Sequence, residues 1–252
     1  MIGVFDSGVG GLSVLKALRA ELPHEDFLYF ADTAHAPYGE RGDAYVADRT
    51  RTVVEHLRSA HAVKALVIAC NTATAAAIHL VRAEHPDLPL VGVEPALKPA
   101  VAASRTKRIG VLATRGTLAS EKFKRLHQSM GAQADFRLQP CDGLADAIEA
   151  QDTGRIAHLC AHYANAVGAL AAGEAQTDVL VLGCTHYPFA ADVLACVCGP
   201  DVKFIDTGTP VARQARRLLA SGGLLRGPTA GTIHLDATGS LPALRAAVDR
   251  WL

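Results

Sequence analysis

The sequence predicts an α/β fold made of two similar lobes, each a mostly parallel sheet flanked by helices. Short apolar runs alternate along the chain with segments of helix length. The runs are continuously apolar, which is typical of parallel strands covered on both faces. Two stretches of the chain also resemble each other in the same order. At 252 residues and 50% hydrophobic composition, the chain can bury a large core.

The predicted strands are rich in Val, Ile, Leu and Phe, which fit a buried pleated surface. They are Ile2–Phe5, Phe27–Phe30, Ala65–Ala69, Leu90–Val93, Ile109–Leu112, Val179–Leu182, Lys203–Ile205 and Thr232–Leu235. The segments between them carry apolar residues at helical spacing. These predicted helices are Leu12–Leu22, Ala44–Ala60, Ala73–Glu84, Thr117–Met130, Ile156–Ala172, Val211–Ala220 and Pro242–Trp251.

Two breaks that contain proline divide the predicted chain into lobes. They lie at Glu94–Pro99 and Asp206–Pro210, where proline interrupts regular structure. The first lobe is therefore expected to comprise residues 1–94 plus a returning segment, 208–252. The second lobe is expected to comprise residues 95–207.

An internal repeat relates the two predicted lobes. The matched strings are Ile2–Gly8 with Ile109–Gly116, and Leu66–Thr72 with Leu180–His186. Short α/β segments share such strings by chance, but two matched pairs in the same order favour duplication. Each half then contributes one cysteine, Cys70 or Cys184, at the end of a strand. We expect the lobes to be related by a pseudo-twofold axis, with the active site between them.

Composition narrows the class of protein. The 25 basic and 25 acidic side chains give a net charge of zero, which provides no electrostatic reason to expect a nucleic acid or an anionic membrane. The apolar runs are too short to cross a bilayer, and the first residues lack the pattern of a signal peptide. A cytoplasmic protein is expected. Its six cysteines are then expected to be thiols and not a disulfide scaffold.

Polar side chains directly follow several predicted strands. In open α/β sheets, ligands bind beyond the carboxyl ends of the strands. Asp6 and Ser7, Cys70 and Cys184 stand at such ends. Two similar acid–base groups on opposite sides of one carbon suit a reaction whose substrate and product are mirror images. Thiols can serve because nearby donors or positive charge bring their pKa close to the operating pH.

Seven strings, in order along nearly the whole chain, resemble the glutamate racemases of the aspartate/glutamate racemase family. They are Phe5–Leu12, Ala36–Gly39, Ala69–Ala73, Gly92–Pro95, Ala113–Leu118, Leu182–Pro188 and Phe204–Gly208. The resemblance implies an isomerase that interconverts L- and D-glutamate by a two-base mechanism without a cofactor, supplying D-glutamate for peptidoglycan. It also implies a homodimer as one expected assembly, although members of the family assemble in different ways.

The resemblance also implies roles for individual residues. Cys70 and Cys184 would be the two acid–base groups. Asp6 would help to activate Cys70, while His186 would serve Cys184 together with Glu149, whose segment follows the family pattern only loosely. The residues expected to bind substrate are Asp6, Ser7, Tyr38, Gly39, Asn71, Thr72, Thr114, Thr185 and His186. Neither a metal nor a cofactor is expected at this site.

Several alternatives stay open at this point. The same chemistry suits a racemase for aspartate or another amino acid, or a decarboxylase that uses one of the two cysteines. A thiol redox protein with a Cys70–Cys184 disulfide belongs to a different class, and a protein-binding role to a third. Individual residues also have ordinary structural explanations. Asp6 suits a helix cap or turn, Tyr38 and Thr114 suit loop packing and a cap, and helical histidines such as His56 and His61 suit surface positions.

Overall fold

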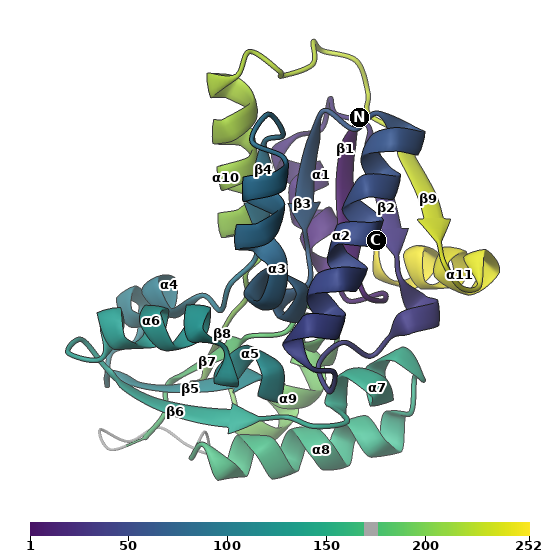
Figure 1. Cartoon of the computed structure of the whole chain (residues 1–252). Coiled ribbons are helices and arrows are strands. Elements are labelled where there is room, and N and C mark those ends of the chain that lie inside the picture. Colours follow the sequence, from purple (N-terminus) through teal and green to yellow (C-terminus); the bar gives the residue numbers. More distant parts are fainter. Residues whose placement is uncertain (169–175) are drawn as a thin grey trace. The chain divides into compact units, whose positions relative to one another are not determined.

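The computed structural model describes residues 1–168 and 176–252, and they form two compact units. The first unit comprises Met1–Val93 together with Gly208–Leu252, and the second comprises Glu94–Thr207. Each unit holds one parallel sheet with helices packed against it (Figure 1). The predicted α/β class with two parallel sheets is therefore confirmed. In the described ranges, no helix is both long enough and apolar enough to span a membrane.

The first unit is built around a five-stranded sheet with the order β4-β3-β1-β2-β9, in which all paired strands are parallel. Its strands are β1 (Ile2–Asp6), β2 (Phe27–Ala31), β3 (Ala65–Ile68), β4 (Leu90–Gly92) and β9 (Ile233–Ala237). Its helices are α1 (Leu12–Glu21), η1 (Thr33–His35), α2 (Asp43–His61), α3 (Asn71–Glu84), α10 (Gly208–Ser221) and α11 (Leu241–Trp251).

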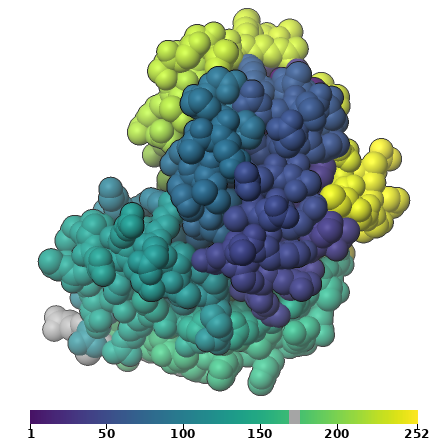
Figure 2. Space-filling view, in the orientation of Figure 1, coloured from purple at the N-terminus to yellow at the C-terminus, as the bar shows by residue number. Residues whose placement is uncertain are grey.

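The last part of the chain completes the first unit. Strand β9 pairs with β2 in parallel, so residues separated by about two hundred positions in the sequence lie side by side. In the space-filling view, the yellow C-terminal residues lie against the blue surface of the first unit (Figure 2). Helix α10 packs against α1, while α2 and α3 pack together over a core that includes Phe30 and Ile68. Helices therefore flank the sheet as predicted.

The second unit is built around a sheet with the order β6-β5-β7-β8, again parallel throughout the described residues. Its strands are β5 (Arg108–Ala113), β6 (Asp135–Pro140), β7 (Val179–Leu182) and β8 (Lys203–Ile205). Its helices are α4 (Leu97–Ala103), α5 (Arg115–Ala119), α6 (Glu121–Met130), α7 (Leu144–Glu149), α8 (Thr153–Ala166), η2 (Tyr187–Ala190) and α9 (Ala191–Cys198).

Strand β7 shows why its sequence is continuously apolar. Val179 and Val181 join one hydrophobic cluster with residues of α4 and α6, while Leu180 and Leu182 join a second cluster with residues of α7, α8 and α9. Successive side chains of a strand point to opposite faces. Because helices cover both faces of this sheet, every position of β7 is buried.

The two sheets share one topology. Read as β4-β3-β1-β2 and β8-β7-β5-β6, their strands correspond in order, and β9 is an addition to the first. The correspondence extends to single backbone hydrogen bonds. The amide after β3, of Ala69, donates to Phe5 at 2.7 Å, and the amide after β7, of Gly183, donates to Leu112 at 2.7 Å. Cys70 and Cys184 follow these two residues, so the repeat predicted from sequence places them at equivalent strand ends.

Each sheet has a glycine at an equivalent position, where a leucine of the neighbouring strand leaves little room for a side chain. Gly3 is paired with Leu66, and Gly110 with Leu180. A Cβ on Gly3 would meet the Leu66 side chain at 3.0 Å, whereas one on Gly110 would meet Leu180 at 2.4 Å and Val167 at 2.9 Å. The side chains of Leu66 and Leu180 are buried and have little room to move.

We expect Gly110→Ala to destabilise the protein more than the matched Gly3→Ala. Overpacking of a filled core costs about 1–3 kcal/mol, and Gly110 is the more crowded position. Urea unfolding of the two variants beside the parent protein measures the difference. A loss in Gly3→Ala that equals or exceeds the loss in Gly110→Ala would contradict the explanation by crowding.

The structure corrects several expected elements. The predicted helix Thr117–Met130 is two helices, because Ser120 caps α6 by accepting a hydrogen bond from the Phe123 amide. Strand β6 was not predicted because its sequence is polar and it lies at a sheet edge. Helices α4, α7 and α9 were also missed, since each is eight residues or shorter. The predicted end of Ile156–Ala172 lies partly outside the described residues; α8 is described over Thr153–Ala166.

Candidate active site

Cys70 stands between strand β3 and helix α3, at the start of the helix. It is the N-cap of α3, and its sulfur accepts a hydrogen bond from the Ala73 amide at 3.4 Å. The hydroxyl of Ser7 lies 3.7 Å from the same sulfur. The free amides at a helix N-terminus carry partial positive charge, which favours an anionic sulfur at this position.

The loop after β1 brings Ser7 to Cys70. Asp6 is fully buried at the end of the strand, and its Oδ1 accepts a hydrogen bond from the Gly8 amide at 2.7 Å. The Tyr29 hydroxyl donates to the Gly8 carbonyl at 2.8 Å, which fixes the loop from the neighbouring strand. Asp6 therefore stabilises a turn, which is the structural role expected as the alternative to a catalytic one. Its predicted role in activating Cys70 stays a prediction.

Asn71 is the clearest sign of a ligand site beside Cys70. It is the first residue of α3 and is 4% exposed, yet neither its amide nitrogen nor its amide oxygen has a hydrogen-bond partner among the described residues. A buried amide without partners costs free energy, so such groups in native proteins call for an explanation. Thr72 is buried next to it. The pair offers polar groups for a small polar ligand.

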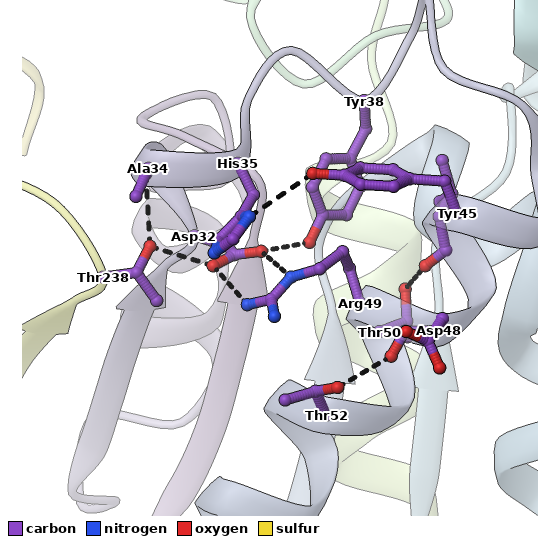
Figure 3. Close-up of polar contacts among 11 residues, drawn as sticks. Asp32, Ala34, His35, Tyr38, Tyr45, Asp48, Arg49, Thr50, Thr52 and Thr238 are labelled. Atoms are coloured by element: carbon purple, nitrogen blue, oxygen red, sulfur yellow. Dashed lines mark hydrogen bonds and ion pairs between the residues drawn. The ribbon is translucent and has the colours of Figure 1, made fainter.

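Tyr38 is held by a buried carboxylate (Figure 3). Its hydroxyl donates to Asp32 at 2.5 Å, and Arg49 of α2 binds both oxygens of Asp32, at 3.0 and 3.1 Å. Thr238, which follows β9, donates to Asp32 at 2.9 Å. Burial and the neighbouring Asp32 raise the pKa of Tyr38 far above its usual value. Tyr38 is therefore a neutral hydrogen-bond donor, and Gly39 follows it in a turn.

Cys184 has a different set of partners. Its sulfur lies 3.6 Å from Nδ1 of His186, and Nε2 of the same imidazole lies 2.6 Å from Oε1 of Glu149 at the end of α7. His186 and Thr185 are buried. The structure therefore brings together Cys184, His186 and Glu149, the three residues that the resemblance grouped. A cation beside a thiol favours the thiolate.

The charge state of His186 depends on these two neighbours. Burial alone would lower the pKa of His186, but its hydrogen bonds with Cys184 and Glu149 raise that pKa well above the ordinary value. The imidazole is thus protonated in the folded protein at neutral pH, and it can donate a proton to each neighbour.

This raised pKa makes the stability of the second unit depend on pH. A raised pKa in the folded state adds stability that is fully present below the unfolded pKa, about 6.5, and is lost as pH rises through the folded value. We expect His186→Asn to show a smaller loss of thermal stability than the parent protein as the pH rises above about 6.5, the unfolded pKa of histidine. Calorimetry of both proteins across this range measures it, and equal pH slopes would contradict it.

Three further buried thiols have pKa values that are raised by burial. Burial raises the pKa of Cys160 to about 11 and that of Cys198 to about 11, and it raises the pKa of Cys141 still further. These sulfurs are neutral at physiological pH and are poor bases. All six cysteines, including the exposed Cys196, are free thiols.

Thr114 has its ordinary structural role. It is the N-cap of α5, and its hydroxyl accepts from the Thr117 amide at 3.2 Å and donates to the Thr117 hydroxyl at 2.9 Å. Thr114 corresponds to Ser7 in the shared topology. Phe5 pairs with Ile68 and Leu112 pairs with Leu182, and Ser7 and Thr114 each lie two residues after Phe5 and Leu112. Its predicted contact with substrate stays a prediction.

Sequence reasoning did not place Asp32 or Cys141 at an equivalent strand end. Asp32 follows β2, and its amide donates to Asp6; Cys141 follows β6, and its amide donates to Ala113. The two positions are therefore equivalent in the two sheets. The strand-end rule that selected Asp6 would also have selected Asp32. No such signal was available for Cys141, because the polar strand before it was not predicted.

Comparison with known proteins gives consistent matches. A family model described as Asp/Glu/Hydantoin racemase matches residues 2–215. A glutamate racemase from Ralstonia pickettii (strain 12J) is 50% identical over 98% of this chain and 86% of its own length. A glutamate racemase isoform from Bacillus anthracis superposes with a TM-score of 0.87 at 30% identity, covering 100% of this chain and 93% of that one. Escherichia coli glutamate racemase, solved with L-glutamate and the activator UDP-MurNAc-ala, gives a TM-score of 0.84 at 28% identity, over 99% and 94% of the two chains.

Proposed function

The chain belongs to the Asp/Glu/hydantoin racemase family, and we propose that it interconverts L- and D-glutamate without a cofactor. The observation that carries this proposal is the pair of cysteines at equivalent strand ends of two sheets with one topology. Each thiol has its own activating contacts. The relatives that match nearly the whole chain carry the name glutamate racemase.

The proposed reaction is a two-base proton transfer at Cα. One cysteine, as thiolate, takes the Cα proton, and the electron pair of the broken C–H bond stays on the substrate as a carbanion. The other cysteine, as thiol, gives its proton to the opposite face of the same carbon and becomes the thiolate. Atoms and charge balance within this exchange, and no redox partner is required. A positioned acid or base contributes about 10²–10⁴-fold in such a step.

The two thiols would be prepared by different means. The N-terminus of α3 and the Ser7 hydroxyl stabilise negative charge on Cys70 without a formal charge. On Cys184, the protonated His186, itself hydrogen-bonded to Glu149, provides an ionic partner. Either sulfur can then act as base or acid according to which enantiomer binds.

Polar groups near the thiols suit an amino acid with two carboxylates. The amide of Asn71 has no hydrogen-bond partner among the described residues. Together with the hydroxyls of Ser7 and Thr72, it can bind carboxylate and ammonium groups. The neutral phenol of Tyr38 donates its single proton to Asp32, which leaves its oxygen as an acceptor for the ammonium group. Donors placed where charge develops stabilise the carbanion, whose charge extends onto the adjacent carboxylate.

The proposal is tested by incubating purified, cofactor-free protein with L-glutamate in D2O. We expect the circular dichroism of the amino acid to decay to zero, with one deuterium gained at Cα by mass spectrometry. Retention of the optical signal without deuterium would overturn the proposal for glutamate. Aspartate and other amino acids, tested in parallel, distinguish a racemase of different specificity, and carbon dioxide release distinguishes a decarboxylase.

We expect His186→Asn to make one of the two proton transfers harder. The equilibrium constant between enantiomers is one, so kcat/KM must remain equal in the two directions for every variant. The asymmetry appears instead in the primary deuterium isotope effect on kcat/KM. That effect should rise for the enantiomer deprotonated by Cys184 and fall for the other. Glu149→Gln should act in the same direction but more weakly, because it keeps the shape of the hydrogen-bonding side chain.

The isotope effects distinguish a role in catalysis from a role in folding. A merely destabilised variant loses active enzyme and leaves both isotope effects unchanged. That outcome would contradict the proposed role of His186 in stabilising the Cys184 thiolate. The proposed cytoplasmic setting and a homodimer stay predictions; light scattering of the purified protein measures the assembly.

A further inference from the structure

Two histidines and one aspartate meet on the surface of the first unit. His56 and His61 lie in the last turns of α2, and Asp236 lies in the edge strand β9. Oδ2 of Asp236 is 3.4 Å from Nε2 of His56 and 3.4 Å from Nε2 of His61. One ligand atom from each residue lies within 4.8 Å of the others, the only such group of three found among the described residues.

The three side chains are held in this arrangement by neighbours. Oδ1 of Asp236 accepts a hydrogen bond from the Ala237 amide at 2.8 Å, which leaves Oδ2 toward the two imidazoles. The His56 ring packs on the buried Phe30, with ring centres 5.4 Å apart, and the His61 ring meets the His56 ring edge-on at 5.3 Å. Side-chain exposures of 44%, 30% and 37% leave the group open to an ion from solvent.

His56 makes a long hydrogen bond to Asp236 at 3.4 Å, and both His–Asp distances also fit a shared metal ion. An N–H to O hydrogen bond spans about 2.7–3.2 Å, which is shorter than both His–Asp separations. Zinc lies about 2.0–2.2 Å from histidine nitrogen and carboxylate oxygen, so two ligands of a tetrahedron lie about 3.3–3.5 Å apart. The observed 3.4 Å falls in that interval. The ligand atoms of the two imidazoles lie within 4.8 Å of each other, and rotation of the side chains would bring this third edge to the same length.

We propose that His56, His61 and Asp236 bind one divalent transition-metal ion of the zinc class. Imidazole nitrogens select zinc, cobalt, nickel or copper over magnesium and calcium, which prefer oxygen ligands. Water would take the fourth position on the solvent side. The site lies apart from Cys70 and its neighbours in the sequence and does not rest on the proposed racemase activity.

Such an ion would tie the returning end of the chain to the rest of the first unit. Among the strands that the structure describes, β9 lies at the edge of its sheet and pairs with β2 alone. A metal held by α2 and β9 adds a link across the same edge. Binding to the folded state raises stability according to the ratio of metal concentration to Kd, and at about 100 times Kd we expect the melting temperature to rise by about 5 °C or more.

The test is a titration of the purified, metal-free protein with Zn²⁺ and with Co²⁺ alone. An exposed pair, His158 and His162, lies one turn apart on α8 and could also bind metal, so the titrations use His162→Ala protein as background. We expect one Co²⁺ bound, with the visible absorption of a tetrahedral ion. The thiolate-to-cobalt charge-transfer band of a sulfur ligand should be absent.

Substitutions in the group decide the outcome. In the same background, His61→Ala and Asp236→Asn should each weaken binding by about tenfold or more and remove the rise in melting temperature. Both variants should unfold cooperatively in the absence of metal, which shows that they fold. No binding by the background protein, a thiolate band, or equal binding by His61→Ala would overturn the proposal.

Discussion

Cys70→Ser and Cys184→Ser should each abolish racemisation, with a loss of about 10²–10⁴-fold or more in kcat. Serine keeps the size of cysteine, but its hydroxyl is a far weaker acid than a thiol and gives no useful base near neutral pH. The reaction needs one base and one acid on opposite faces of Cα. Loss of either group therefore stops turnover in both directions, which chiral analysis of the glutamate formed from each enantiomer measures.

Each single variant should still exchange the Cα proton of one enantiomer. The remaining thiol can remove the proton from its own face and return a deuteron to that face in D2O. We expect Cys70→Ser and Cys184→Ser to exchange the Cα proton of opposite enantiomers. The exposed Cys196 gives the control, since Cys196→Ser should racemise at the parent rate. Normal racemisation by both catalytic-site variants would exclude the two-thiol mechanism.

Asp32→Ala should cost about 3–5 kcal/mol of stability in the first unit, because it leaves the partly buried Arg49 without its counter-charge. The hydroxyls of Tyr38 and Thr238 also lose their acceptor. The single tryptophan, Trp251, lies in α11 of this unit, so its fluorescence during urea unfolding reports the relevant stability. Because Tyr38 is proposed to line the substrate site, kcat/KM should also fall.

An exposed ion pair in the same unit is the matched control. Arg51 pairs with Glu84, and their side chains are 51% and 35% exposed, so solvent weakens the pair and Arg51→Ala should change stability far less than Asp32→Ala does. The double variant Asp32→Ala with Arg49→Met should recover part of the loss, since it removes the uncompensated charge as well. Equal losses of stability in Asp32→Ala and Arg51→Ala would show that the buried Asp32–Arg49 pair does not contribute more to stability than the exposed pair.

The local sequence pattern was sufficient to predict those strands that are buried on both faces. The strands Ile2–Asp6 and Val179–Leu182 are buried at every position because helices cover both faces of their sheets, and their apolar runs, Ile2–Phe5 and Val179–Leu182, are visible in sequence. Strand β6 pairs with β5 at an edge, where half-exposed polar residues suffice. Its hydrogen bonds depend on a neighbour distant in sequence, so no local pattern marked it.

The α/β class, the repeat and the two cysteines at strand ends are predictable from the sequence alone. These features follow from residues close together in the chain, whose spacing reports which face is buried. Which side chains act together, in contrast, depends on how distant segments pack. Asp32 meets Thr238, and His56 meets Asp236, across about two hundred residues, because β9 returns to pair with β2. The partners of a polar side chain depend on packing between distant segments, which spacing along the chain does not encode.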